Sequence, residues 1–172
     1  MSRIAVVPGS FDPVTLGHLS IIERGARLFD RLWVVVAVNP NKQPLFSTAE
    51  RVEMIGEVAA HLGNVSCAST EGFVVDFARQ YGARYLIRGV RSCTDVDGEI
   101  ALAHMNRELA PEVETVFVPA HAQLSEVSSS RLKELARQGM DTSQYCPPEI
   151  ATRLQRRATA IVVDEKAKVA RV

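Results

Sequence analysis

The sequence predicts an α/β fold, a Rossmann-like, doubly wound parallel five-stranded sheet in the order 3-2-1-4-5, with helices on both faces and C-terminal helices. Two observations carry this prediction. Short runs rich in Val, Ile, Leu and aromatic residues alternate with longer segments of helical periodicity. One of the short runs, 32–38, is apolar throughout, which is typical of a central parallel strand covered on both faces.

The alternation assigns each element in chain order. Ser47-Thr48-Ala49-Glu50 fits a capping box that starts the second helix, Gly82 ends the third, and Pro147-Pro148-Glu149 opens the last. We predict strands at 3–7, 32–38, 65–69, 84–88 and 114–118, and helices at 16–29, 48–61, 73–81, 96–109, 129–138 and 148–160. A single domain is expected over 1–160, followed by a charged, loosely held C-terminal tail at 161–172.

The composition excludes several classes of protein. Lys+Arg and Asp+Glu both count 20, so the net charge of zero gives no support for a nucleic-acid-binding protein. No apolar run is long enough to cross a bilayer, and the N-terminus lacks a signal-peptide pattern. Cys67, Cys93 and Cys146 are odd in number and lack metal-ligand spacing, which indicates reduced thiols in a cytoplasmic protein.

The segment from Pro8 to His18 collects glycines, a hydroxyl and a histidine at the turn between the first strand and the first helix. The first helical turn is expected to offer unpaired N–H groups and the positive end of the dipole to a phosphate. Gly9 and Gly17 would let a nucleotide approach the backbone, and the Ser10 hydroxyl is placed to bridge two phosphates. This context favours a functional, neutral His18 that donates to phosphoryl oxygens over an ordinary histidine at a helix start. The segment predicts the triphosphate site of a nucleotidyltransferase.

A second polar loop, Arg88-Gly89-Val90-Arg91, follows the fourth strand directly. An arginine at the end of a buried strand favours an anionic partner, which is either a phosphate or a carboxylate among Asp95, Asp97 and Glu99. We prefer phosphate recognition by Arg88. The strand order places this loop beside the one after strand 1, at the switch point where ligands bind.

Three further segments are weaker candidates. Lys42 follows the second strand at the same sheet edge, where it could clamp the attacking group or be an ordinary surface lysine. Ser128-Ser129-Ser130 caps the helix at 129–138 or offers a second anion site at its N-terminus. Phe11 is equally well explained as core or as a nucleotide contact. Asp12-Pro13 is read as a structural turn.

Taken together, these segments resemble the phosphopantetheine adenylyltransferase family of the nucleotidyltransferase superfamily. The matching strings follow the family's order over about positions 3–150: PGSFDPVTLGH, NPNKQPLF with STAERV, LIRGVR, DVDGEIALAHMNR and VSSSRLKELA. The TxGH string marks the superfamily alone, whereas its combination with IRGVR, AHMNR and VSSS is much more specific.

The resemblance implies in-line transfer of the adenylyl group of ATP to 4′-phosphopantetheine, giving dephospho-coenzyme A and pyrophosphate without a covalent enzyme intermediate. It also implies magnesium, a cytoplasmic homohexamer and coenzyme A as a feedback inhibitor. His18 would stabilise the transition state. Ser10, Lys42 and Arg88 would hold the phosphate of the acceptor, with Val74 against its pantetheine arm. The implied ATP contacts are Ser10, Phe11, His18, Gly89, Val90, Arg91, Glu99, Leu124, Ser125, Glu126, Val127, Ser128, Ser129 and Ser130.

The sequence departs from the family pattern at Gly98, Leu124 and Glu126, where aromatic or apolar residues are usual. These departures concern the adenine pocket more than the phosphoryl chemistry. Rival interpretations are another nucleotidyltransferase, acting on nicotinamide mononucleotide or glycerol phosphate, and a non-catalytic sensor of a nucleotide or of coenzyme A.

Overall fold

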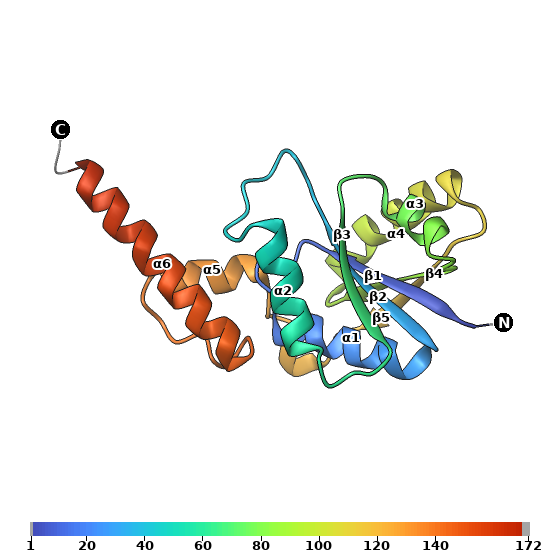
Figure 1. The fold of residues 1–172 in the computed structure, drawn as a ribbon, viewed down its shortest axis with the longest axis horizontal. Coiled ribbons are helices and arrows are strands. Elements are labelled where there is room, and N and C mark those ends of the chain that lie inside the picture. The colour runs from blue at the N-terminus through green and yellow to red at the C-terminus, as the bar shows by residue number, and fades with distance from the viewer. Residues whose placement is uncertain (1, 170–172) are drawn as a thin grey trace.

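The computed structural model of the protein describes residues 2–169, and its centre is one parallel sheet (Figure 1). The strand order is β3-β2-β1-β4-β5, which confirms the predicted topology. All pairings are parallel, and the β1–β2 register runs from Ile4 opposite Arg31 to Gly9 opposite Val36. The strands are β1 (Ile4–Gly9), β2 (Arg31–Ala37), β3 (Val65–Thr70), β4 (Tyr85–Val90) and β5 (Glu114–Pro119).

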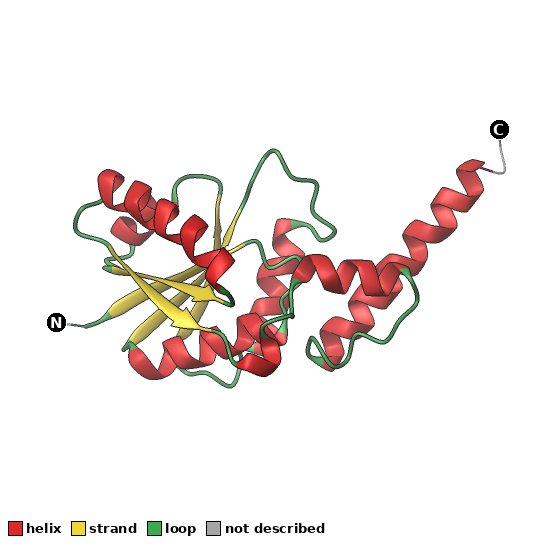
Figure 2. Ribbon diagram, turned by 180° about the vertical axis from the view of Figure 1, so that it is seen from behind, coloured by secondary structure: helices red, strands yellow, loops and turns green. Residues whose placement is uncertain are grey.

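Helices cover both faces of this sheet, as Figure 2 shows. The helices α1 and α2 lie on one face and α3 and α4 on the other. The elements are α1 (Leu16–Leu28), α2 (Thr48–Val58), α3 (Val74–Gln80), α4 (Cys93–Leu109), the short 3₁₀ helix η1 (Ala122–Leu124), α5 (Ser129–Arg137) and α6 (Pro148–Val169). None of the helices within residues 2–169 combines the length and the apolar character that a membrane span requires.

The sheet separates two apolar cores, and strand β2 shows why both form. Leu32, Val34 and Val36 point into the larger core, which α1, α2, α5 and α6 also fill. Val35 points into the smaller core beneath α3. Since neighbouring side chains of a strand lie on opposite faces, a strand that serves two cores must be apolar throughout, as predicted for this run.

Helix signals in the sequence act as expected at the start of α2. Ser47 caps the helix, its hydroxyl accepting from the Glu50 N–H, while the Glu50 carboxylate accepts from the Ser47 N–H at 2.7 Å. Gly82 follows α3 with a positive φ of 65°, a conformation that favours glycine.

The last helix is longer than predicted. Helix α6 does not end near residue 160 but continues to Val169, through a stretch that contains no Gly or Pro to end it. The predicted loose tail is therefore helical as far as Val169, and residues 170–172 lie outside the described part of the chain. The division into a domain at 1–160 and a tail stays a prediction.

Helix α4 is unusual for an element that covers a sheet. None of its residues, all of which the structure describes, is buried. Ile100, Met105 and Leu109 are exposed apolar side chains on it, and Phe117 of the neighbouring edge strand β5 is exposed too. This face of the molecule therefore presents apolar surface to solvent.

Candidate active site

A cavity of about 310 Å³ opens at the carboxyl ends of β1 and β4, the switch point of the sheet. Its walls come from the loop after β1, from the loop after β4 and from the segment joining η1 to α5. The structure thus brings together loops that lie about seventy residues apart in the sequence, as the strand order predicted.

Most of the residues predicted to bind substrates line this cavity: Ser10, Phe11, His18, Arg88, Gly89, Arg91, Glu99, Leu124, Val127, Ser128 and Ser129. Six do not line it: Lys42, Val74, Val90, Ser125, Glu126 and Ser130. Their roles, and those of the lining residues, stay predictions.

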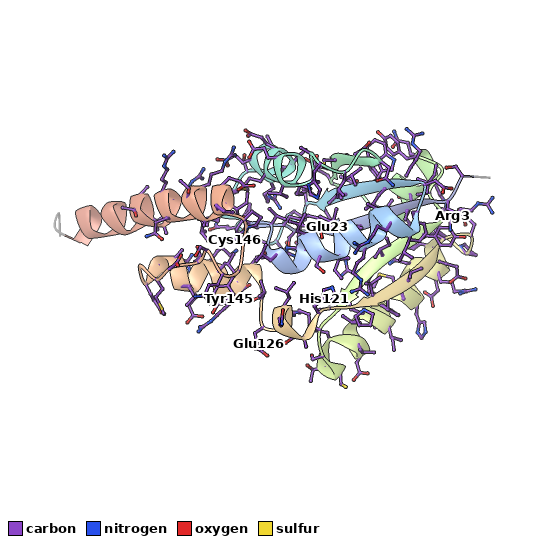
Figure 3. All side chains as sticks on the ribbon, turned by 90° about the horizontal axis from the view of Figure 1, so that it is seen from below. Arg3, Glu23, His121, Glu126, Tyr145 and Cys146 are labelled. Carbon is purple, nitrogen blue, oxygen red and sulfur yellow. The ribbon has the colours of Figure 1, made fainter. Side chains whose placement is uncertain are left out.

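Four of the six residues outside the cavity either follow strands that end at the same sheet edge or line an adjacent groove. Lys42 is exposed in the turn after β2, and Val74 begins α3 after β3, so both follow strands whose carboxyl ends share the sheet edge. Ser125 and Glu126 line a neighbouring groove that shares Arg91 and Ser128 with the cavity. Glu126 is exposed, and Figure 3 shows it at the margin of the molecule beside η1.

The imidazole of His18 is held in one orientation by Thr15, the N-cap of α1. The Thr15 hydroxyl accepts from the His18 N–H, and the Thr15 N–H donates to His18 Nδ1 at 3.1 Å. Because Nδ1 is an acceptor in this bond, the proton of the neutral ring is assigned to Nε2. The ring edge beyond Thr15 is therefore a hydrogen-bond donor.

The surroundings of His18 keep this ring neutral. Burial, followed by the positive charges of Arg91 and Arg88, lowers its pKa from 6.5 to about 4. The sequence predicted a neutral imidazole because of the dipole of its helix. In the structure the lowered pKa of His18 comes from burial and from the two arginines across the cavity. A neutral donor facing developing negative charge is the arrangement of an oxyanion hole.

The N-terminus of α1 is less open to an anion than the sequence predicted. Two of its first three N–H groups are already bonded, since Leu16 N donates to the Tyr145 carbonyl and His18 N to Thr15. The N-terminus of α5 differs. Within the described chain, no partner accepts from the N–H groups of Ser129 and Ser130, so this helix offers the freer anion site.

Phe11 belongs to the core and to the cavity wall at once. Its side chain is buried, its φ is +46°, and its ring meets the His18 ring edge-on with centroids 5.0 Å apart. A Cβ on Gly9 would lie 2.9 Å from Phe11 Cζ. Gly9 is therefore required because a side chain at this position would collide with the Phe11 ring. This contact explains the glycine more directly than the approach of a nucleotide does.

Strand β4 continues through Val90, so Arg88, predicted to begin a loop, lies in the strand and only Arg91 follows it. Both arginines are paired with carboxylates of α4. Arg88 binds Glu99 through Nε at 2.6 Å and Nη2 at 2.7 Å, and Arg91 binds Asp95 through Nε at 3.0 Å. The structure thus contains the ion-paired alternative. Arg88 and Arg91 still line the cavity, so pairing does not remove them from it.

Asp12 is the buried carboxylate that joins the segments around the cavity. Its oxygens accept from the N–H groups of Leu45 and Phe46, both at 2.9 Å, and from Lys133 Nζ of α5 at 2.8 Å. Burial on its own would raise the pKa of Asp12, but these bonds and the Lys133 charge outweigh it and lower the pKa. The residue read as a simple turn former therefore connects three segments.

The carbonyl groups of the loop after β1 are also bonded from outside. Arg88 donates to the Pro8 carbonyl at 3.1 Å, the buried Arg51 of α2 to that of Ser10 at 2.9 Å, and the Ser129 hydroxyl to that of Pro13 at 2.7 Å. With its acceptors fixed by three different elements, the loop keeps a defined shape before any ligand arrives.

Helix α6 supports the cavity from further away. Arg157 donates to the Leu45 carbonyl, pairs with Glu50 and lies 5.0 Å from the centre of the Phe46 ring. Leu45 and Phe46 are the residues whose N–H groups bind Asp12, so the last helix holds the same loop from its opposite side.

Sequence reasoning missed the supporting residues Arg51, Lys133 and Tyr145 and the joining role of Asp12. Thr15 carried a signal, because Thr-x-x-His at a helix start allows the reciprocal bonds of a capping box. Arg51 and Lys133 carried none, since charged residues in a helix are exposed by default. Their partners lie 41 and 121 residues away in sequence.

Comparisons with known proteins place the chain among nucleotidyltransferases. A sequence model described as cytidylyltransferase-like matches residues 6–135. A protein of Heliobacterium modesticaldum named phosphopantetheine adenylyltransferase is 48% identical over 151 residues, which is 88% of this chain and 90% of that protein. Its namesake in Synechococcus elongatus is 47% identical over 150 residues, 87% and 90% of the two chains.

A solved structure from Vibrio parahaemolyticus, assigned as a nicotinate-nucleotide adenylyltransferase, superposes with a TM-score of 0.67 at 19% identity. The match covers 90% of this chain and 99% of the other. At this identity the likeness shows a shared fold.

Replacing Asp12 by Asn is expected to lower the free energy of unfolding by about 3 kcal/mol, because it leaves Lys133 without its buried partner. Urea unfolding of the purified protein measures this. Asp30→Asn is the matched control, since the Arg3–Asp30 pair is exposed and a surface ion pair contributes little to stability. Equal losses in the two variants would contradict a joining role for Asp12.

The His18 ring is expected to titrate near pH 4 in the free protein. Between pH 6.5 and 4 the unfolded chain binds a proton that the folded chain does not. This group therefore makes the free energy of unfolding fall as the pH falls through that window. Ring carbon shifts followed by NMR, assigned with a His18→Gln variant, give the pKa. Titration near 6.5 would contradict the described environment.

Proposed function

The chain belongs to the cytidylyltransferase-like family and, within it, to the phosphopantetheine adenylyltransferases, and from this premise we propose that it transfers the adenylyl group of ATP to 4′-phosphopantetheine. The products are dephospho-coenzyme A and pyrophosphate. The observation that carries the proposal is the gathering of a neutral imidazole, two arginines and an open helix N-terminus around one cavity. Such a set suits a reaction in which charge moves between phosphoryl groups.

The reaction is an in-line displacement at the α-phosphorus of ATP. An oxygen of the acceptor's phosphate forms a bond to that phosphorus, while the bond to the bridging oxygen of the β-phosphate breaks. Pyrophosphate leaves with the electron pair. The phosphate nucleophile is already ionised at neutral pH, so no side chain has to take up a proton or form a covalent intermediate, and catalysis is positioning plus charge stabilisation.

His18 donates from Nε2 to the phosphoryl oxygens as charge accumulates on them. Its neutral state and fixed Nδ1 bond make it a donor before the substrates bind. The N–H groups of Ser129 and Ser130 at the start of α5 face the remaining phosphates of ATP, with Arg91 beside them. Phe11, Leu124 and Val127 provide apolar wall for the nucleotide.

Arg88 and Ser10, which both line the cavity, hold the phosphate of the acceptor. Lys42 and Val74, which follow β2 and β3 at the same sheet edge, bind the acceptor where it leaves the cavity. Gly98, one of the departures from the family pattern, is surrounded by open space, because an added Cβ would meet no atom within 4 Å. The glycine therefore does not obstruct the site.

Magnesium enters this proposal with the nucleotide, as MgATP. Among the described residues no group of three His, Cys, Asp or Glu side chains is placed to hold a metal ion. The cavity's carboxylate, Glu99, is bonded to Arg88. This donor set suits an ion held chiefly by substrate phosphates and water, which is how Mg²⁺ commonly binds at ATP sites.

Two further assignments follow from the same premise. Coenzyme A contains the whole of the product dephospho-coenzyme A, so it can occupy the cavity and act as a feedback inhibitor. A cytoplasmic location is supported by Cys67, Cys93 and Cys146, which are all free thiols, as predicted.

The proposed assembly is a homohexamer, and α4 supports it. A helix without a buried residue, carrying exposed Ile100, Met105 and Leu109 beside exposed Phe117 of β5, has apolar surface available for a second copy of the chain. The exposed edge of β5 lies next to the same surface.

Incubation with MgATP and single acceptors tests the reaction. Pyrophosphate release is expected with 4′-phosphopantetheine and not with nicotinamide mononucleotide or glycerol phosphate. His18→Ala is expected to lower kcat by about 10²-fold, the loss typical of one preorganised donor. Turnover with nicotinamide mononucleotide alone would overturn the proposed acceptor, and binding of ATP without turnover would support the sensor interpretation.

Sedimentation velocity at micromolar concentration tests the assembly. The wild-type chain is expected to sediment as a hexamer, and Met105→Glu to shift the distribution towards smaller species, because a carboxylate would enter an apolar contact. Met140→Glu is the matched control, since Met140 is 51% exposed and Met105 52%, and Met140 lies beyond α5. A monomeric wild type, or equal shifts in both variants, would contradict the assembly.

A further inference from the structure

Arg51 of α2 carries a positive charge in the interior of the protein. Only 4% of the residue is exposed, and its N–H groups donate to neutral oxygens: Nη1 to the Ser10 carbonyl at 2.9 Å, Nη2 to the Thr48 hydroxyl at 3.1 Å and Nε to the Ser47 carbonyl at 3.4 Å. Among residues 2–169 no carboxylate forms an ion pair with it. Arginine is almost never fully buried unless it is paired, because the burial of a charge is costly. A buried guanidinium without a carboxylate therefore calls for a functional explanation.

Two arginines that line the cavity differ from Arg51 in this respect. Arg88 and Arg91 both pair with carboxylates of α4. Glu50, which precedes Arg51 in the sequence, pairs with Arg157 instead. The charge of Arg51 is thus not offset by a neighbouring carboxylate of the described chain, and it acts on the loop after β1, to which its Nη1 is bonded.

The peptide group that joins Ser10 to Phe11 connects Arg51 with the cavity. Its carbonyl accepts from Arg51, and both of its residues line the cavity. The peptide bond is trans, so its N–H, which belongs to Phe11, points away from Arg51. No residue between 2 and 169 accepts a hydrogen bond from this N–H. It is therefore a donor that a ligand can use.

Phe11 has a backbone conformation that its surroundings must hold in place. Its φ of +46° lies in a region that residues other than glycine seldom adopt. Arg51 fixes the carbonyl that precedes Phe11, and the Phe11 ring packs against the His18 ring with centroids 5.0 Å apart. The Phe11 N–H and the His18 imidazole thus belong to one packed unit.

We propose that Arg51 is a positioning residue that acts through the Ser10–Phe11 peptide group on the phosphates of the substrates. The inference rests on the proposed function. Arg51 holds the carbonyl end of the peptide group, so the Phe11 N–H at its other end is presented to the phosphoryl oxygens in a fixed direction. Arg51 itself does not touch the substrates.

The charge of Arg51 contributes as well as its hydrogen bond. A guanidinium bonded to a carbonyl polarises the peptide group and strengthens the donor at its opposite end. Because Arg51 is buried, water does not screen this effect as it would at the surface. The stronger donor is worth most in the transition state, when negative charge on the phosphoryl oxygens is greatest.

Three substitutions of Arg51 test this role. Arg51→Met is expected to lower kcat about tenfold, less than the loss of a direct donor, and to raise the Kd of MgATP less than about threefold. Arg51→Gln, which can keep a hydrogen bond without the charge, should resemble Arg51→Met. Arg51→Lys, which keeps the charge, should recover most of the activity.

Titration calorimetry with MgATP, without the acceptor, gives both the Kd and the fraction of protein that binds. Expressing kcat per binding site removes any contribution from misfolded protein, so a residue that only supports the fold would leave this value unchanged. Arg153→Met is the matched control. Arg153 also contacts α2, through Glu53 and Glu57, but it is not bonded to the loop after β1, and its loss should leave kcat per site unchanged.

Three outcomes would overturn the inference: an unchanged kcat per site in Arg51→Met, equal activities of the Gln and Lys variants, or an equal loss in Arg153→Met. The first would indicate a role in the fold alone, and the second would exclude the charge. If Arg51→Met does not fold, the comparison of the Gln and Lys variants decides. Absence of turnover in the wild-type protein would instead refute the proposed function.

Discussion

A carboxylate with little access to water has to be surrounded by donors, and Asp12 meets this requirement with donors from two other parts of the chain. Asp12 itself belongs to the loop after β1. Its partners are two N–H groups from the loop after β2 and an ammonium group from α5. Each of these segments carries residues assigned to substrates, so the arrangement of the active site follows from satisfying one buried charge.

The same principle extends to the neutral groups of that loop. The carbonyls of Pro8, Ser10 and Pro13 each accept from a side chain of another element, and Leu16 gives its N–H to Tyr145. A loop whose polar groups are bonded in the free protein does not have to reorganise when a charged ligand enters. Preorganisation of this kind is the main contribution that a protein can make to phosphoryl transfer.

Much of this molecule could be predicted from its sequence, because hydrophobic period and turn chemistry are local signals. The strands, the sheet order and the convergence of the loops after β1 and β4 follow from runs such as 32–38 and from the rules of α/β folds. The capping box at Ser47 was also predicted correctly from the sequence. The end of α6 was not, because the mixture of charged and apolar residues after Ala160 suits an exposed helix as well as a charged tail.

The pairing of charges across long sequence separations could not be predicted from the sequence. Arg51 and Lys133 look like surface residues of helices, and only the packed fold shows which oxygen each one meets. The depressed pKa of His18 belongs to the same class. It depends on burial and on two arginines at least seventy residues away, and neither is visible in the sequence around residue 18.

The contact of Arg157 with the loop at Leu45 and Phe46 sets a limit on how short this chain can be. Ile150, Leu154 and Ala158 anchor α6 in the main core at four-residue spacing, and Arg157 sits within the last of these turns. A chain that ended just after Ala158 would keep all of these contacts, whereas one that ended a single turn earlier would release the loop beside the catalytic centre. Truncation tolerance therefore changes abruptly within four residues, although the helix itself continues to Val169.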